Sequence, residues 1–461
     1  MSILAAYAVP HPPIIIPEVG RGEETKIAAT SQAYAGVMRR AAEHRPDVLI
    51  ITSPHAPMYA DYFHISPGAG ASGSLAQFRA PQAACSVEYD RELARRIEAL
   101  AEREGLPAGA LGEREKTLDH GTLIPLLFLQ KTGFSCPIVR IGLSGLSAAE
   151  HYRLGQCIAG AVEALGRRAV FIASGDLSHR LKANGPYGFA PEGPEFDKQI
   201  TAIFASGDFG AMLALSPELA DAAGECGLRS FQIMAGALDR RAVTHELLSY
   251  EGTFGVGYGV AAFEVTGADD ARDFGSRYAR SREEALKQTK ADEDAYVRLA
   301  RLSLETYVRE GRRAAVPDGL PPEITGARAG AFVSLKKDGR LRGCIGTISP
   351  TAKSLAAEIM QNAVSAGAHD PRFDPVRPEE LDKLVYSVDV LGEAEPVGSE
   401  AALDPKRYGV IVQNGSRRGL LLPDLEGVDT VEEQVSIARR KAGIGAGEPV
   451  TLSRFEVVRH R

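Results

Sequence analysis

Residues 3–9, ILAAYAV, and residues 47–53, DVLIITS, are the two stretches that decide the fold. Both are short and mostly apolar, which predicts strands buried inside a sheet. The residues between them include a stretch, 23–44, with the length and polarity of a helix. A strand, a helix and a second strand in this order are typical of an α/β domain with a largely buried sheet.

The same alternation continues along the first half of the chain. In residues 90–104, apolar positions recur at helical spacing with charges between them. We expect helices over 90–104 and 148–165, strands over 138–141 and 169–173, and a closing pair of strands over 243–250 and 256–265. Residues 1–266 are therefore predicted to form one α/β domain.

The composition changes after residue 266. Residues 267–291, GADDARDFGSRYARSREEALKQTKA, are charged and poor in apolar side chains, as a linker or an exposed helix would be. We place a linker at 267–285 and a smaller α+β domain at 286–461. In that domain we expect helices over 293–310, 354–365 and 431–442, and strands over 331–335, 384–391, 410–413 and 419–422.

The overall composition excludes several classes of protein. The chain of 461 residues is too long for one ordinary core, and its apolar content of 44% is that of a globular protein. The net charge of -7, with scattered basic residues, does not indicate nucleic-acid binding. Five cysteines without a CxxC pair fit reduced thiols in a cytosol. We expect a cytoplasmic protein without a signal peptide or membrane span, and a homo-oligomer is compatible with this composition.

Four histidines stand out by position. His11 and His55 lie in proline-flanked loops just after the first two predicted strands, and His179 follows the strand at 169–173. His120 precedes an apolar helix. Because ligands of open α/β sheets bind beyond the carboxyl ends of strands, such imidazoles could converge on one ion, with Zn, Fe or Cu favoured over Mg or Ca. Taken singly, a histidine is more often a hydrogen-bonded or surface residue.

Four segments carry a family resemblance: HPPIIIP at 11–17, SPHAP at 53–57, LDHGTLIPL at 118–126 and SGDLSH at 174–179. In this order they resemble the class III extradiol (LigB-like) ring-cleaving dioxygenases and the related Memo family. The resemblance covers residues 1–266 and implies a mixed sheet flanked by helices. It also implies an Fe(II) site with His11 and His55 as ligands, His120 as the substrate-contacting histidine and His179 as the acid–base histidine.

The resemblance implies a carboxylate as the third ligand, and its identity is open. Glu225, which precedes a predicted helix, would complete a two-histidine-one-carboxylate site and is the interpretation adopted. Cys226 is the alternative, because Memo proteins place a cysteine in a similar context. Glu246 is more distant and lies in a predicted strand. A carboxylate with two imidazoles suits Fe(II), whereas a thiolate favours Cu(I) or Zn.

Three functions are compatible with such a site. The first is an Fe(II)-dependent extradiol dioxygenase that opens a small aromatic diol with dioxygen. Three ligands on one face of the ion leave room for both diol oxygens and for dioxygen, and a neutral His179 would take and return a diol proton. The second is a Memo-like metal-binding module without ring cleavage that serves a radical-SAM partner protein. The third is a zinc-type hydrolase or lyase.

The second half has motifs of its own: LRGCIGT at 341–347 and HDPRF at 369–373. They resemble the AMME-syndrome candidate-region domain, over residues 286–461. The fusion of both domains resembles the family called AmmeMemoRadiSam system protein A, whose name implies the radical-SAM partner. Cys344, near Arg342, is either a reactive thiol in a basic setting or a small strand residue, and we adopt the second interpretation. We assign this domain to recognition or scaffolding.

Overall fold

The computed structural model describes residues 2–112, 114, 117–425 and 427–461. The chain divides into two compact units, Met1–Ser281 and Arg282–Arg461. Helix α10 (Phe274–Asp292) crosses the border and has no buried residue among those described. The segment expected to be a linker is therefore an exposed helix over much of its length. The limits of the functional domains at residues 266 and 286 stay a prediction.

The N-terminal unit is built on one six-stranded mixed sheet. Its strand order is β7 (Ile138–Gly142), β2 (Val48–Ser53), β8 (Ala169–Ser174), β1 (Ile3–Val9), β10 (Tyr258–Ala268) and β9 (Arg241–Glu251). The first four strands are parallel to one another, and β10 and β9 are antiparallel. Every residue of β2 and β8 is buried, because helices cover both faces of the sheet. The predicted fold class is confirmed.

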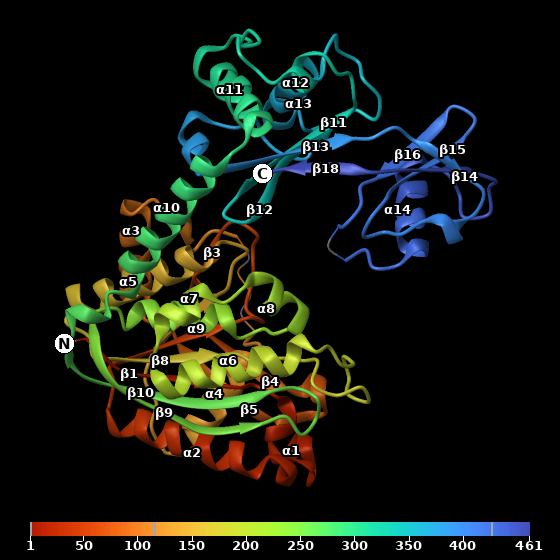
Figure 1. Cartoon of the computed structure of the whole chain (residues 1–461). Coiled ribbons are helices and arrows are strands. Elements are labelled where there is room, and N and C mark those ends of the chain that lie inside the picture. The colour runs from red at the N-terminus through yellow and green to blue at the C-terminus, as the bar shows by residue number, and fades with distance from the viewer. Residues whose placement is uncertain (1, 113, 115–116, 426) are drawn as a thin grey trace. The chain divides into compact units, whose positions relative to one another are not determined.

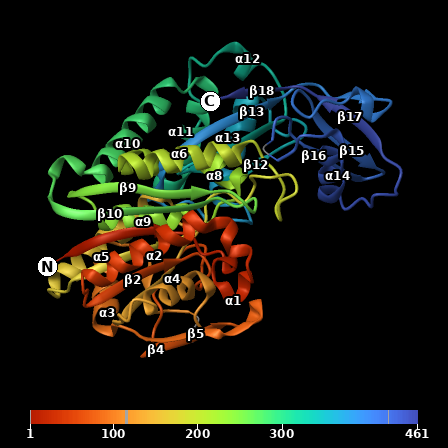
Figure 2. The ribbon, with the colours of Figure 1, turned by 90° about the horizontal axis from the view of Figure 1, so that it is seen from below.

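Two apolar layers hold the helices against this sheet (Figure 1, Figure 2). Successive residues of β1 point to opposite faces, so that Tyr7 packs in one layer and Ala8 in the other. The layer of Tyr7 contains α2 (Ala28–Glu43) and α4 (His120–Gln130). The layer of Ala8 contains α3 (Arg91–Arg103), α5 (Ala148–Ala164), α6 (Glu192–Ser206), α7 (Phe209–Ala214), α8 (Pro217–Ala223) and α9 (Leu228–Ala237). Because β1, β2 and β8 are parallel to one another, their carboxyl ends lie at the same end of the sheet, which is called its carboxyl edge below.

The sequence pattern does not predict several smaller elements of this unit. They are α1 (Pro17–Gly20), the short pair β3 (Phe63–His64) and β6 (Ala108–Gly109), the hairpin β4 (Gly70–Leu75) and β5 (Ala80–Glu88), and helices α6 to α8. The hairpin buries few of its residues, so its apolar alternation is weak.

The C-terminal unit holds two antiparallel sheets. The first has the order β12 (Arg340–Gly346), β11 (Ala331–Lys337), β13 (Leu384–Leu391) and β18 (Val457–His460), and it packs with α11 (Ala295–Glu310), α12 (Pro322–Thr325) and α13 (Leu355–Ala368). The second has the order β14 (Glu395–Val397), β17 (Thr451–Phe455), β15 (Gly409–Asn414) and β16 (Arg417–Leu421), and it packs with α14 (Val431–Ala442). This unit is the smaller strand-rich domain that the sequence predicts. No helix in the described part of the chain is long and apolar enough to cross a membrane.

Candidate metal centre

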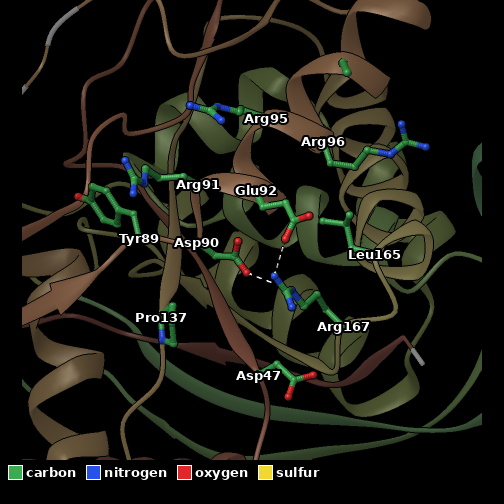
Figure 3. Close-up of a pocket in the computed structure, with 11 residues that line it drawn as sticks. Asp47, Tyr89, Asp90, Arg91, Glu92, Arg95, Arg96, Pro137, Leu165 and Arg167 are labelled. Atoms are coloured by element: carbon green, nitrogen blue, oxygen red, sulfur yellow. Dashed lines mark hydrogen bonds and ion pairs between the residues drawn. The ribbon is translucent and has the colours of Figure 1, made fainter.

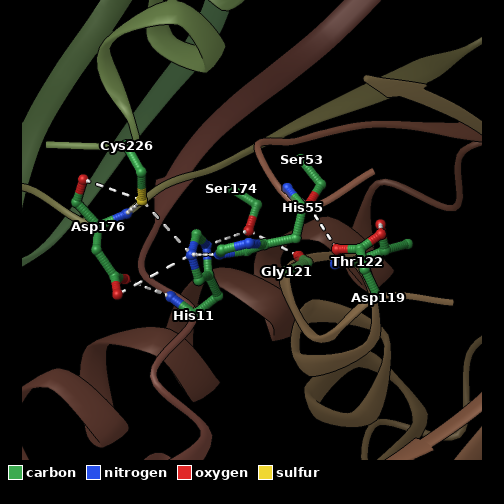
Figure 4. Close-up of polar contacts among 9 residues, drawn as sticks. All are labelled: His11, Ser53, His55, Asp119, Gly121, Thr122, Ser174, Asp176 and Cys226. Atoms are coloured by element: carbon green, nitrogen blue, oxygen red, sulfur yellow. Dashed lines mark hydrogen bonds and ion pairs between the residues drawn. The ribbon is translucent and has the colours of Figure 1, made fainter. Parts of the chain in front are cut away.

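His11 and His55 lie at the carboxyl edge of the parallel strands. β1 ends at Val9 and β2 ends at Ser53, so each histidine follows closely after its strand. The Nε2 atoms of the two imidazoles are 3.0 Å apart (Figure 4). His11 is buried and His55 is exposed, so the pair is open to solvent on one side.

Ser174, at the end of β8, determines which nitrogen of His11 faces the site. The Ser174 hydroxyl donates its only proton to the carbonyl oxygen of Gly121, at 2.7 Å. It therefore accepts a hydrogen bond from Nδ1 of His11, at 3.0 Å. With the ring proton on Nδ1, the lone pair of Nε2 points toward His55 and can bind a metal ion.

Cys226 supplies a third donor atom at this point. Its Sγ lies 3.6 Å from Nε2 of His11, and the ligand atoms of His11, His55 and Cys226 all lie within 4.8 Å of one another. The backbone N–H of Asp176 donates to this sulfur at 3.3 Å, which orients it. Across the described residues, this is the one group of three or more His, Cys, Asp or Glu side chains that converges in this way.

Two glycines allow the thiol to reach the histidines. Gly175 follows β8 and Gly227 precedes α9, and a Cβ on Gly175 would lie 2.1 Å from Cα of Gly227. The two backbones touch because neither residue carries a side chain. This contact places Cys226 beside Asp176, so the Ser-Gly-Asp turn and the Cys-Gly turn build the site together.

The two glutamates considered from the sequence are not part of this group. The Glu225 carboxylate accepts a hydrogen bond from the backbone N–H of Leu228, at 2.6 Å, and so satisfies a free donor at the start of α9. Burial raises the pKa of Glu225 to about 7. Glu246, on β9, forms an ion pair with Arg40 at 3.0 Å. The geometry thus brings Cys226, and not the adopted Glu225, to the histidine pair.

Asp176 is a site residue that the sequence reasoning missed. Its Oδ1 accepts a hydrogen bond from the backbone N–H of His11 at 2.7 Å, and its Oδ2 lies 4.0 Å from Nε2 of that ring. Burial raises the pKa of Asp176 to about 6. The signal that could have identified it is the SGDLSH segment, where a carboxylate precedes the candidate acid–base histidine by three residues.

Burial keeps the imidazoles of the site neutral. Desolvation lowers the pKa of His11 to about 3 and the pKa of His120 to about 3, and it also lowers the pKa of His55. Desolvation, with the negative charges of Asp176 and Glu225, raises the pKa of the Cys226 thiol well above its usual value. Near pH 7 the rings offer lone pairs, and the thiol must release its proton when it binds a cation.

His120 lies at the start of α4, beside the histidine pair. Its ring centroid is 4.0 Å from that of His55. The preceding residue, Asp119, caps the helix by accepting a hydrogen bond from the N–H of Thr122 at 2.9 Å. Asp119 also pairs with the buried Arg140 at 2.7 Å. The hydroxyl of Ser53, two residues before His55, also donates to Asp119 at 2.6 Å, which links the start of α4 to the His55 loop.

His179 lies at the same edge, although its nitrogens are outside the converging group. Its Nε2 is buried and has no hydrogen-bond partner in the described part of the chain. The ring centroid is 5.0 Å from that of Tyr187, and desolvation lowers the pKa of His179. A neutral ring with an unused nitrogen can accept a proton from a bound molecule.

A separate cavity of about 820 Å³ lies at the opposite, amino edge of the parallel strands (Figure 3). Asp47 and Pro137, which directly precede β2 and β7, are among its lining residues. Arg167 forms ion pairs there with Asp90 and Glu92, at 3.3 and 2.8 Å. None of the candidate site residues lines this cavity, so it is not part of the metal centre.

The converging donor set suits a transition-metal ion. Two imidazole nitrogens and one sulfur are ligands of soft or borderline cations, whereas Mg and Ca prefer oxygen. Three protein ligands leave at least one coordination position for a small molecule. The exposed side of His55 is where such a molecule would enter.

Comparison with known proteins agrees with the two-unit architecture. Residues 5–261 match the family described as the catalytic LigB subunit of aromatic ring-opening dioxygenase, and residues 297–460 match the AMMECR1 family. Protein CA_C1420 of Clostridium acetobutylicum is 43% identical over 469 residues, which cover 100% of both chains. A Thermotoga maritima protein is 54% identical over 171 residues, which cover 37% of this chain and 98% of that protein.

Among solved structures, the uncharacterized protein PH0010 from Pyrococcus horikoshii is 32% identical and covers 36% of this chain and 88% of its own, with a TM-score of 0.34. The LigB match alone spans more than half of the chain, and the Clostridium relative matches it from end to end. The chain therefore belongs to the LigB family, with an AMMECR1 domain fused after its LigB domain.

Proposed function

We propose that the N-terminal unit is a Memo-like metal-binding module in which His11, His55 and Cys226 hold one transition-metal ion. The observation that carries this proposal is the convergence of their ligand atoms within 4.8 Å. A thiolate with two imidazoles favours Zn(II) or Cu(I) over the Fe(II) of a two-histidine-one-carboxylate site. We propose that this module does not cleave aromatic rings.

The neighbouring residues have defined roles in this proposal. Ser174 holds the His11 ring with Nε2 toward the ion. Asp176 anchors the backbone of His11 and orients the Cys226 sulfur through its own N–H. The bound ion would supply the positive charge that stabilises the thiolate and a coordination position open to solvent. His179 would exchange a proton with a molecule held there.

A ring-cleaving dioxygenase is the second candidate, and one observation favours it. The Asp176 carboxylate approaches Nε2 of His11 to 4.0 Å, so a carboxylate is close enough to be considered for an Fe(II) site. In that case His120 would contact a small aromatic diol and His179 would take its proton. Membership of the LigB family supports a small-molecule substrate together with dioxygen.

We also propose a radical-SAM protein as the partner of this module. The support is the fusion of a LigB domain with an AMMECR1 domain, which resembles a family named for such a partner. Affinity purification of the tagged full chain from its own host tests this. A radical-SAM protein should be retained in comparable amount, and its absence would remove the partner from the proposal.

Metal titration of three full-length proteins tests the ligand set. The wild type should bind one Zn(II) or Cu(I), and Cys226→Ser should bind it roughly 100-fold more weakly. Glu225→Gln is the matched control, because its amide oxygen can still accept the Leu228 N–H, and it should bind within about threefold of the wild type. Loss of metal in Glu225→Gln with retention in Cys226→Ser would show that the proposed ligand set is wrong.

Oxygen uptake separates the two candidate functions. The full chain is loaded with Fe(II) without oxygen and then mixed with a panel of catechols and oxygen. The metal-binding module predicts neither oxygen uptake nor a coloured ring-opened product. Uptake that is lost in Asp176→Asn and kept in Cys226→Ser would establish the dioxygenase instead.

A further inference from the structure

The cavity at the amino edge of the parallel strands has no part in the function proposed above. Its volume of about 820 Å³ is in the range of pockets that hold small organic molecules. It lies at the opposite edge of the sheet from His11 and His55, so a molecule bound there would leave the metal centre free. Helix α3 forms one wall of this cavity.

The amphipathic pattern of α3 turns arginines toward the cavity. Leu93 and Ile97 are buried in the core of the N-terminal unit. Because a helix has 3.6 residues per turn, positions outside that apolar stripe face away from the core. Arg91, Arg95 and Arg96 hold such positions, and all three are exposed and line the cavity.

The three guanidinium groups are available to a ligand. Within the described residues, the side chains of Arg91, Arg95 and Arg96 form no hydrogen bond or ion pair. Each therefore keeps its positive charge and its fork of N–H donors. Arg91 and Arg95 are four residues apart and lie on neighbouring turns of the helix, so their like charges repel each other. A bound anion would offset this repulsion.

The acidic residues of the cavity do not balance these arginines. Asp90 and Glu92 both pair with a fourth arginine, Arg167, at 3.3 and 2.8 Å. Asp47 is the remaining carboxylate in the wall, and it accepts the backbone N–H of Arg168 at 2.8 Å. The excess of positive charge thus lies on the α3 side of the cavity, in a chain whose net charge is -7.

The start of α3 adds to this positive potential. The helix has 13 residues and begins at Arg91, after Asp90 as its cap. A cation in the first turn of a helix is unfavourable, because the aligned peptide dipoles make that end of the helix positive. Arg91 therefore lies where its charge opposes helix stability unless an anion is bound beside it.

Tyr89 adds an unsatisfied donor to the wall. The residue is 7% exposed, and its buried hydroxyl has no hydrogen-bond partner in the described part of the chain. Figure 3 shows Tyr89 on the side of the cavity to which the side chains of Arg91 and Arg95 extend. A buried donor without a partner is uncommon in a folded protein, and an acceptor oxygen of a bound anion would supply one.

We propose that this cavity binds a small organic molecule with a chain of two or three phosphate groups, such as a nucleotide. Arg91 and Arg95 bind the phosphate oxygens, because the paired N–H donors of a guanidinium group match them. A phosphate chain carries enough charge and acceptor atoms for several guanidinium groups at once, whereas a single carboxylate does not. Pro137 and Leu165 in the wall offer apolar surface to the organic part.

Isothermal titration calorimetry of the full-length protein tests this site with ATP, tripolyphosphate and inorganic phosphate. ATP and tripolyphosphate should both bind at least about 10-fold more tightly than inorganic phosphate, because they carry more negative charge. Tighter binding of ATP than of tripolyphosphate would support a nucleotide as the ligand, and equal binding would support recognition of the phosphate chain alone. A single-stranded oligonucleotide that binds more tightly than either would overturn the proposal in favour of nucleic acid.

Substitutions on α3 provide the test and its control. Arg95→Gln should weaken ATP binding by about fivefold, the effect of one unit charge about 4 Å away in water, and adding Arg91→Gln should bring the loss to about 25-fold. Arg103→Gln removes an exposed arginine of the same helix that does not line the cavity. It lies about 12 Å from Arg95 along the helix axis, beyond the screening length of about 8 Å, so the affinity should stay within about twofold.

Two results would overturn the proposal. One is ATP binding that is no tighter than the binding of inorganic phosphate. The other is ATP affinity that the double substitution of Arg91 and Arg95 leaves unchanged, because the phosphate chain would then bind elsewhere.

Discussion

Cys226 of the N-terminal unit lies beside two neutral imidazoles and the Asp176 carboxylate, whereas Asp370 and Arg372, which form an ion pair, hold the backbone of Cys344 in the C-terminal unit. The first thiol is surrounded by lone pairs and negative charge, which favour a bound cation. The second lies beside an arginine and an aspartate whose charges balance, and it is not part of a converging group of ligand side chains among the described residues. The same residue type therefore stands in two different environments, and its neighbours decide whether it can bind a cation.

A single added methyl group in the N-terminal unit should be enough to weaken metal binding strongly. In Gly175→Ala the new Cβ would lie 2.1 Å from Cα of Gly227, so the two turns must separate and carry Cys226 away from the histidines. We expect metal affinity to fall roughly 100-fold. Gly343→Ala is the matched change in the C-terminal unit, where the new Cβ would meet the Ala366 carbonyl at 2.1 Å. It should spare metal binding, because the converging group of ligand side chains lies in the N-terminal unit.

Metal titration of both glycine variants measures this difference. Wild-type metal affinity in Gly175→Ala would show that the close contact of the turns does not place Cys226.

Each unit contains an arginine–aspartate pair, and the two pairs differ in the burial of the arginine. The side chains of Arg140 and Asp119 are 1% and 10% exposed, whereas those of Arg372 and Asp370 are 54% and 2% exposed. Arg140→Met leaves a buried carboxylate without its cation and should lower the free energy of unfolding by about 3–5 kcal/mol. Arg372→Met also leaves a buried carboxylate without its cation, but water screens the half-exposed guanidinium, so this change should cost less than Arg140→Met. Urea denaturation, analysed for the unit that carries each substitution, gives both values, and equal losses would contradict this difference.

The N-terminal unit should lose stability as the pH rises toward neutrality. Burial raises the pKa of Asp197 to about 7, so the folded state keeps a proton that the unfolded state has released. The free energy of unfolding should therefore fall by roughly 2 kcal/mol between about pH 5.5 and 7. Asp197→Asn keeps an oxygen to accept the Ser178 N–H and should make this slope smaller, whereas Asp176 and Glu225, whose pKa values are also raised, keep their contributions. Chemical denaturation at several pH values measures it, and an unchanged slope in the variant would exclude Asp197 as its source.

Glu380 of the C-terminal unit should make the stability fall as the pH decreases, and this effect should be smaller than that of Asp197. Although burial opposes it, hydrogen bonds from Arg342 and other donors lower the pKa of Glu380 to about 2. Its stabilising contribution is present above the unfolded value of about 4.3 and is lost as the pH falls toward 2. Thermal unfolding at pH values from about 5 down to about 2.5 should show a smaller loss for Glu380→Gln than for the wild type. Equal losses would contradict this assignment.

The predictability of the fold follows the strength of the local pattern. The ranges expected for β1, β13 and α14 agree with the structure residue by residue, because these segments have continuous or strictly periodic apolar positions. The hairpin of β4 and β5 is missed, since it lies at the surface and buries few side chains.

The part of the site that lies at strand ends can be predicted from the sequence. The placement of His11 and His55 at one edge follows from the rule that ligands bind beyond the carboxyl ends of parallel strands. Whether Glu225 or Cys226 faces that edge cannot be read from local sequence, because a contact between two distant turns decides it. Asp370 and Arg372, which contact the backbone of Cys344, likewise come from a separate segment.

X-ray absorption spectroscopy of the Zn(II)-loaded full chain tests the ligand set most directly, because it distinguishes sulfur from nitrogen and oxygen at the metal. We expect one sulfur at about 2.3 Å and nitrogen ligands at about 2.0 Å. Cys344→Ser should keep the sulfur signal and Cys226→Ser should lose it. A spectrum of the wild type with nitrogen and oxygen ligands alone would contradict the assignment of Cys226 and restore a carboxylate as the third ligand.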